Sequence, residues 1–313
     1  MRTGFKRGYV VASAFLIGII LCAWNLSNSQ AQNATAAKLS GFRENVPTVS
    51  ESDFAKIEAA LPVRAQSKPK RARRLLVFTL ARGYVHSSIP HGALAIQRMG
   101  QKTGAYSAVV SDDLAAFEAK NLQQFDAVCF LSTTGDVLQT ATSRQAILNF
   151  VRNGGGVVGV HAATDSHNNW PEFGALMGGF FDGHPWNAGD TVTLRVEDRE
   201  SPLCKHFPQE TFTITDEIYQ FREYSRQRQR VLLGLELSQT PRRDGMKRTD
   251  NDYPVSWIRR EAKGRVFYSS LGHREDIYWN PLVLQHYLAG IQFALGDLSA
   301  TTTPLPQPTS QKP

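Results

Sequence analysis

Short apolar runs alternate with stretches of helical periodicity over the first half of the folded part of the chain. The apolar runs have strand length and lie at 75–80, 106–110, 127–131 and 157–160. Between them, helical patterns occupy about 87–104, 114–121 and 143–153. Strands that are apolar at nearly every position are buried on both faces, and intervening helices supply the crossovers of a parallel sheet. The pattern predicts an α/β fold whose mostly parallel sheet is covered by helices on both faces.

The second half of the chain is less regular. Alternating or apolar segments predict strands at 190–197, 212–215 and 231–236, and a hairpin of 255–260 with 265–270 around Ala262-Lys263-Gly264. A closing helix is predicted at 281–295.

The N-terminus has the order of regions found in secretory signal peptides. Three cations fall within residues 1–7, an apolar run spans 8–24, and Ser29-Gln30-Ala31 offers a small-x-small cleavage site. Residues 1–31 are therefore predicted to be a signal peptide of an exported protein, periplasmic or secreted. An uncleaved membrane anchor formed by residues 8–24 is the alternative, because 17 apolar residues lie at the lower limit for spanning a bilayer.

The rest of the chain divides by composition. Residues 32–74 are predicted to be a flexible segment that contains a short helix from Ser50 and ends in a basic linker. Residues 75–298 form the folded domain, and the Thr/Pro/Gln-rich tail 299–313 is predicted to be disordered. The net charge of +7 lies outside the domain, which holds 22 Lys and Arg against 24 Asp and Glu. A nucleic-acid partner is not expected, because such a partner requires basic charge on a folded face.

Three of the eight histidines follow predicted strands or their first turn. They are His86, His161 and His273. Ligands of open α/β sheets bind outside the carboxyl ends of the strands, so these imidazoles are expected to converge there. His184 lies in the loop 180–186 and could fold over the same end.

His161 is the most specific candidate. Gly159-Val160-His161-Ala162-Ala163 predicts a tight strand-to-loop turn, where other α/β enzymes hold a nucleophile. Asp165, four residues later, could orient the imidazole or bind a hydroxyl. The alternative is that His161 only bonds a backbone group beneath a loop, and the expected convergence with His86 and His273 favours the functional interpretation.

Carboxylate and aromatic side chains complete the candidates. Glu217 follows the 212–215 strand and could be a general base or a metal ligand, with Tyr219 nearby as a hydroxyl donor. A surface carboxylate is an equal alternative for Glu217. Trp170 and Trp186 lie in Gly/Asn/Pro-rich loops and are expected to present aromatic faces to a ring-shaped polar ligand such as a sugar.

Several ordered segments together resemble the ThuA-like (trehalose utilisation) family over about residues 56–296. They are Arg82–Ile89, Gly154–Asp165, Phe181–Pro185, Asp216–Tyr219 and Gly264–His273. The resemblance implies a flavodoxin-like three-layer sandwich, similar to class I glutamine amidotransferases, and a link to carbohydrate utilisation. Glutaminase chemistry is not expected, because it needs a Cys nucleophile at the tight turn after a central strand, which is called the elbow. Here the elbow residue is His161, Cys129 lies within a strand and Cys204 lies in a distant loop.

These observations favour an enzyme that acts on a sugar, glycoside or oxidised sugar as a hydrolase, lyase or isomerase. A divalent Zn-like ion would polarise a carbonyl or activate water, and without metal the histidines would transfer protons. A non-catalytic carbohydrate-binding module is the alternative. The expected metal ligands are His86, His161, His184 and His273. The expected catalytic residues are His161, Asp165, Glu217 and His273, and the expected binding residues are His86, Trp170, His184, Trp186 and Tyr219.

Overall fold

The computed structural model describes residues 41–308 of the 313-residue chain. The predicted signal peptide or anchor at 1–31 and the last residues of the tail, 309–313, lie outside the described residues. Among the helices that are described, none is both long enough and apolar enough to cross a bilayer.

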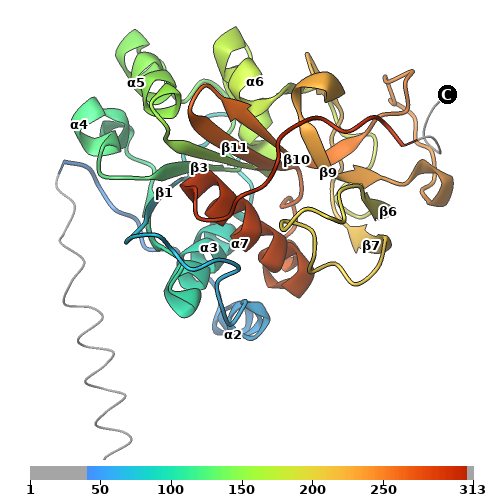
Figure 1. Ribbon diagram of the computed structural model, residues 1–313, viewed down its shortest axis with the longest axis horizontal. Coiled ribbons are helices and arrows are strands. Elements are labelled where there is room, and N and C mark those ends of the chain that lie inside the picture. The colour runs from blue at the N-terminus through green and yellow to red at the C-terminus, as the bar shows by residue number, and fades with distance from the viewer. Residues whose placement is uncertain (1–40, 309–313) are drawn as a thin grey trace, which may run out of the picture. The chain divides into compact units, whose positions relative to one another are not determined.

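A nine-stranded mixed sheet forms the centre of the domain (Figure 1). Its first five strands are mutually parallel and its last four run antiparallel to their neighbours. The expected parallel arrangement therefore holds for these first five strands, and the other four strands are antiparallel. In spatial order the strands are β2 (Ser107–Ser111), β1 (Arg74–Phe78), β3 (Ala127–Leu131), β4 (Gly156–Val160), β11 (Gly264–Ser269), β10 (Pro254–Glu261), β9 (Arg230–Leu235), β6 (Thr191–Val196) and β7 (Thr211–Thr215).

Helices lie on both faces of this sheet (Figure 1). One face carries α3 (Ile89–Thr103) and α7 (Pro281–Leu295), with α2 (Glu51–Ala60) packed outside them. The other face carries α4 (Ala119–Leu122), α5 (Ala141–Arg152) and α6 (Pro171–Met177). Short 3₁₀ turns connect these elements: η1 (Leu114–Phe117), η2 (His161–Asp165), η3 (Arg226–Arg228), η4 (Leu237–Gln239) and η5 (Glu275–Trp279). A separate two-stranded ribbon pairs β5 (Phe180–Phe181) with β8 (Phe221–Arg222).

Burial explains why the sequence pattern predicted these elements well. Every residue of β3 and β4 is buried, as expected for central strands covered on both faces. Helix α7 is apolar almost all round because it packs against β4 and β11 beneath it and against α3 and η5 beside it. The predicted strands and the closing helix are confirmed, with bounds shifted by at most two residues.

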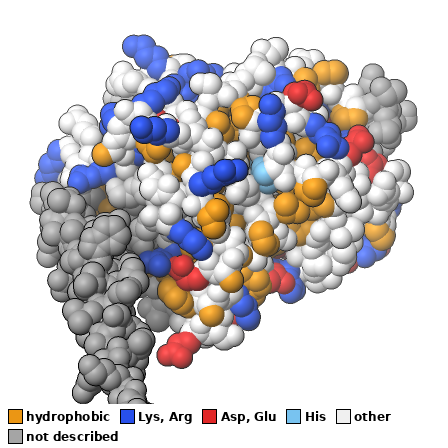
Figure 2. Space-filling model, turned by 60° about the horizontal axis from the view of Figure 1, so that its bottom comes forward, with side chains coloured by type: hydrophobic (Ala, Val, Ile, Leu, Met, Phe, Trp, Pro, Cys, Tyr) orange, Lys and Arg blue, Asp and Glu red, His pale blue; other side chains and the backbone are white. Residues whose placement is uncertain are grey.

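The basic linker contacts the folded domain in the described part of the chain. Arg73 lies 2.7 Å from Asp297 and 3.2 Å from Asp126, and the Ser67 and Gln66 amides donate to the Gln292 side chain. These contacts hold the segment that leads into β1 against the end of α7. On the face shown in Figure 2, basic side chains are scattered, with acidic side chains among them.

The tail contacts the domain without forming a helix or strand over 299–308. The Arg230 guanidinium donates to the Thr303 carbonyl, and the Gln307 side chain donates to the Asp250 carbonyl.

His286 is a fully buried histidine on α7. Its Nδ1 lies 3.1 Å from the Leu203 carbonyl oxygen, and its Nε2 lies 2.8 Å from the Ser256 hydroxyl oxygen, which itself donates to the Tyr268 carbonyl. Burial, together with the nearby His206, lowers the pKa of His286 to about 3. The imidazole therefore stays neutral in the folded state at pH values where an unfolded chain would protonate it, near pH 6.5.

This burial predicts acid-sensitive stability. Above about pH 6.5, His286 does not reduce the free energy of unfolding. As the pH falls from 6.5 toward 3, protonation of the unfolded chain lowers this free energy by up to about 1.4 kcal/mol for each pH unit. His167, with a pKa lowered by burial to about 4, acts in the same direction. Urea unfolding from pH 7 to pH 4 should show this slope, and His286→Gln should flatten it relative to the control His91→Gln. An identical slope in His286→Gln would contradict the assignment.

Candidate functional site

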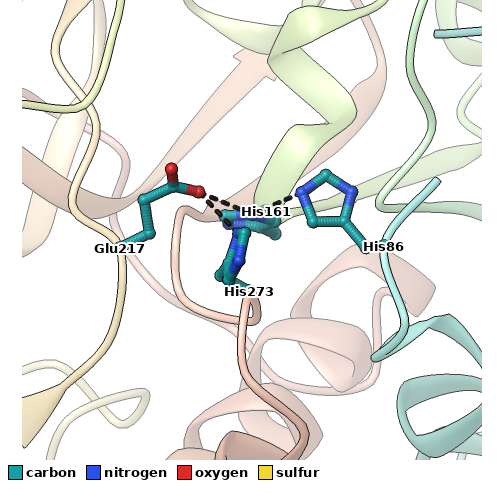
Figure 3. A group of neighbouring side chains, drawn as sticks. All are labelled: His86, His161, Glu217 and His273. Atoms are coloured by element: carbon teal, nitrogen blue, oxygen red, sulfur yellow. Dashed lines mark hydrogen bonds and ion pairs between the residues drawn. The ribbon is translucent and has the colours of Figure 1, made fainter. Parts of the chain in front are cut away.

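Four side chains converge where β1, β4, β7 and β11 end. His86 lies in the loop after β1, His161 opens η2 directly after β4, and His273 follows β11 through Gly272. Glu217 follows β7 after one residue. One potential ligand atom from each of the four lies within 4.8 Å of the others (Figure 3). The convergence of the three imidazoles expected from the strand ends is confirmed, and we refer to these four residues as the His₃Glu cluster.

His161 occupies a strained turn that is held by its neighbours. Its backbone adopts φ 50°, in the left-handed region that non-glycine residues rarely occupy. The Tyr268 hydroxyl donates to the His161 carbonyl at 2.7 Å, which fixes the turn. Gly159 permits the approach, since a Cβ there would lie 2.8 Å from the Tyr268 ring. The turn therefore presents the imidazole beyond the end of β4.

The orientation of the His161 ring is set by a backbone carbonyl. Its Nδ1 lies 2.7 Å from the Ser270 oxygen, so Nδ1 carries the proton and donates. The opposite nitrogen, Nε2, then offers its lone pair to the centre of the cluster. Around it lie His86 Nε2 at 3.1 Å, Glu217 Oε2 at 3.5 Å and the Tyr219 hydroxyl, which donates at 2.9 Å.

Glu217 connects the remaining polar groups. Its Oε2 lies 2.7 Å from His273 Nδ1, and its Oε1 lies 2.9 Å from His184 Nδ1 at the exposed side of the cluster. Burial alone would raise the pKa of Glu217, but the contacts with His161 and His273 outweigh it and hold this pKa well below its usual range. The contact between Glu217 and His273 in turn raises the pKa of His273.

His86 is a buried imidazole that stays neutral. Burial lowers its pKa to about 3, and the neighbouring His161 and His273 act in the same direction. Its Nδ1 is buried and has no hydrogen-bond partner among the described residues. A neutral imidazole has one N–H and one lone pair, so His86 Nε2 either donates to the His161 lone pair or, in the other tautomer, offers its own lone pair to a cation between the two rings.

Asp216 was not among the residues selected from the sequence. Its carboxylate is fully buried and accepts from the amides of Gly272 at 2.7 Å and Arg274 at 3.1 Å, on either side of His273. Gly272 has φ 128°, and a Cβ there would lie 2.5 Å from the Tyr278 hydroxyl, so the loop needs glycine at this position. Burial raises the pKa of Asp216 to about 6. Its sequence signals are its place beside Glu217 and its position in the Asp216–Tyr219 segment that carries the family resemblance.

Asp165 lies half-buried near the cluster. Among the described residues it accepts from the Asn168 side chain at 3.2 Å, while Ser270, and not Asp165, orients His161. Burial raises the pKa of Asp165, so it favours the protonated form more than an ordinary aspartate does.

The expectation that Trp170 and Trp186 stand exposed is wrong. Trp170 is 5% exposed and stacks on Phe173, and Trp186 is fully buried with its indole N–H donating to the Pro241 carbonyl. Both loops fold back onto the core, where a large indole buries more apolar surface than it would at the rim of a pocket. Tyr219, by contrast, contacts the cluster as expected.

The two hydrogen bonds to Asp216 predict a local effect on the His273 loop. Asp216→Asn replaces one of the two accepting oxygens with a donor, so the amides of Gly272 and Arg274 should exchange hydrogen about tenfold faster or more. Asp276→Asn is the control, because Asp276 contacts only the Arg274 side chain in this loop, at 2.8 Å. Equal protection of these two amides from hydrogen exchange in Asp216→Asn and in the control would show that Asp216 does not hold the His273 loop.

The fold and the cluster together define the class of protein. It is an α/β protein with a mixed sheet and a buried group of three imidazoles and one carboxylate at the strand ends, a donor set able to hold a metal ion.

Comparison with protein families identifies the chain further. Residues 74–294 match the ThuA model, described as trehalose utilisation, and the chain belongs to this family.

Solved structures support the fold. A putative ThuA-like protein from Bacteroides uniformis shares 23% identity and a TM-score of 0.55, covering 71% of this chain and 94% of that one. A putative ThuA-like protein from Parabacteroides merdae shares 18% identity and a TM-score of 0.52, covering 75% and 93%. At these identities the likeness shows the fold alone. No curated protein matches the chain.

Proposed function

We propose that this ThuA-family chain is a metal-dependent enzyme that acts on a sugar or an oxidised sugar. The observation that carries the proposal is the His₃Glu cluster, whose four potential ligand atoms lie within 4.8 Å of one another. The proposal includes a flavodoxin-like three-layer arrangement similar to class I glutamine amidotransferases, and export of the chain. The trehalose description of the family supports a carbohydrate substrate.

The spacing of the cluster suits a divalent ion. A metal–nitrogen bond of about 2.0–2.1 Å in a tetrahedral site puts two ligand atoms about 3.4 Å apart. Nε2 of His161 lies 3.1 Å from His86 Nε2 and 3.5 Å from Glu217 Oε2, close to that value. Three imidazoles with one carboxylate favour Zn²⁺ or a similar ion. The Ser270 carbonyl on His161 Nδ1 is the kind of outer contact that orients a ligating histidine.

Glu217 replaces His184 in the ligand set expected from the sequence. His184 contacts the other oxygen of Glu217, at 2.9 Å, and its side chain is 40% exposed. It is therefore placed to orient the carboxylate and to meet a substrate hydroxyl at the entrance.

An ion held by three or four of these residues, with one coordination position left for substrate or water, would supply Lewis-acid chemistry, either polarising a carbonyl or activating water. The side chains around the cluster supply the rest. The Tyr219 hydroxyl, 2.9 Å from His161 Nε2, can donate a hydrogen bond to a substrate oxygen. Asp165 is half-buried and has a raised pKa. It can therefore hold a proton and transfer it to an oxygen of the substrate's leaving group or of a substrate that rearranges.

Amidotransferase chemistry of the cysteine type finds no accessible thiol in the described residues. Cys129 and Cys204 are both buried, and burial raises the pKa of each thiol. Neither belongs to the His₃Glu cluster. The elbow position is occupied by His161, which supports coordination or proton transfer in place of acyl transfer.

Metal content tests the centre directly. Purified full-length protein should hold about one equivalent of a divalent transition metal by mass spectrometry, because four donors converge on one point. His161→Ala and the isosteric Glu217→Gln should each lower Zn²⁺ affinity by about 100-fold or more. His91→Ala, which removes a histidine outside the cluster, is the control. Unchanged affinity in folded Glu217→Gln would contradict the metal centre.

Turnover tests the reaction. Incubation with trehalose, other glycosides and 3-keto-glycosides should give a product that disappears with a chelator and returns on addition of Zn²⁺, since the ion would supply the Lewis acid. Product analysis separates hydrolysis, elimination and isomerisation. Saturable sugar binding without any product, in protein that holds its metal, would favour the carbohydrate-binding module and overturn the enzyme.

A further inference from the structure

We propose that Tyr84 and Phe181 are the two aromatic walls of the substrate site and position a sugar in its ring form over the His₃Glu cluster. The inference rests on the proposed function and deepens it, because it specifies the form of the substrate. These rings replace Trp170 and Trp186, which the structure buries in the core.

Tyr84 is an exposed aromatic residue in contact with two members of the cluster. It is 64% exposed, and its ring centroid lies 4.7 Å from that of His86 and 6.2 Å from that of His273. The ring is edge-on to His86 and nearly parallel to His273, at 20°. One face of the phenol is therefore open beside a polar centre, which is the arrangement that a ring-shaped polar ligand requires.

The exposure of Tyr84 does not come from a loose loop. The Thr134 hydroxyl donates to the Tyr84 carbonyl at 2.8 Å and accepts from the Gly83 amide at 3.1 Å. The Arg82 amide donates to the Thr134 carbonyl at 2.9 Å. Thr134 is itself buried in the loop three residues after β3. The sheet thus fixes the backbone that carries the phenol, so the ring is presented at little entropic cost on binding.

Phe181 flanks the other end of the cluster. Its ring centroid lies 4.5 Å from that of Tyr219 and 6.0 Å from that of His184, at 21° to the latter ring. Tyr219 contacts His161, and His184 contacts Glu217. In Figure 3, His86 and Glu217 lie at opposite ends of the cluster. The cluster is therefore bracketed by Tyr84 on the His86 side and by Phe181 on the Glu217 side.

Solvent reaches the cluster at His184 and His273, whose side chains are 40% and 23% exposed. A hollow of about 520 Å³ lies beside His86 on the side of Thr79 and Asp112. Val85 is 67% exposed, so the segment around Tyr84 presents apolar surface to whatever enters. A pyranose offers apolar C–H faces to such surface and hydroxyls to the polar centre.

Binding of ring and open-chain polyols tests this placement. Calorimetry would use metal-loaded full-length protein with trehalose, methyl α-D-glucopyranoside and acyclic sorbitol as probes. Tyr84→Ala and Phe181→Leu should each weaken binding of the two pyranosides by about 3- to 10-fold and leave sorbitol unchanged. Tyr84→Phe should bind like the wild type, because the ring face and not the hydroxyl makes the contact. Phe54→Ala, at a 41% exposed ring on α2, is the control.

Metal content, measured on the same samples, separates this inference from the proposed function. Wild-type protein that holds metal but does not prefer pyranosides to sorbitol overturns the aromatic walls and leaves the metal centre standing. Equal pyranoside binding in Tyr84→Ala and the wild type does the same. Protein without metal that still loses pyranoside binding in Tyr84→Ala supports the walls and counts against the metal centre.

Discussion

The hydrogen bond from His161 Nδ1 to the Ser270 carbonyl is the interaction on which the site depends. It exists because β4 and β11 are parallel neighbours in register, with Val160 opposite Ser269, so the residues after each strand meet. The bond decides which imidazole nitrogen carries the proton and therefore which nitrogen faces His86, Glu217 and Tyr219. The left-handed turn at His161 costs backbone strain, and the Tyr268 hydroxyl offsets part of it.

Burial gives the cluster its electrostatic character. A carboxylate with little exposure is costly unless cations or hydrogen-bond donors surround it, and Glu217 meets His184 and His273. His86 responds in the opposite way and remains neutral. The cluster therefore places a charged carboxylate next to an uncharged imidazole, a combination that suits proton transfer or cation binding. A structural ion pair such as Arg195 with Glu236 differs, because it joins one cation to one carboxylate without a neutral imidazole beside them.

Much of the fold follows from the sequence because buried strands leave an unmistakable apolar run. Strand ends also predicted that His86, His161 and His273 would meet, since parallel strands finish at one edge. The contacts of Ser270 and Asp216 could not be predicted from the sequence. The first depends on strand register, and the second depends on the loop after β11 passing next to the residue after β7. Helix α6, only seven residues long, was missed for lack of periodicity. Local polarity placed Trp170 and Trp186 at the surface, but tertiary packing buried both.

The elbow position shows how one geometry can serve different chemistry. In an α/β enzyme that uses covalent catalysis, a strained turn after a central strand lifts a nucleophile toward substrate. Here the same kind of turn carries an imidazole whose proton is committed to a backbone carbonyl, so the side chain points a lone pair outward. The nitrogen with that lone pair lies 3.5 Å from Glu217 Oε2 and 3.1 Å from His86 Nε2, the geometry on which the proposed cation binding rests. The chemistry proposed for this chain therefore rests on the residue at the turn, which is His161 and not a cysteine, and not on the fold that carries it.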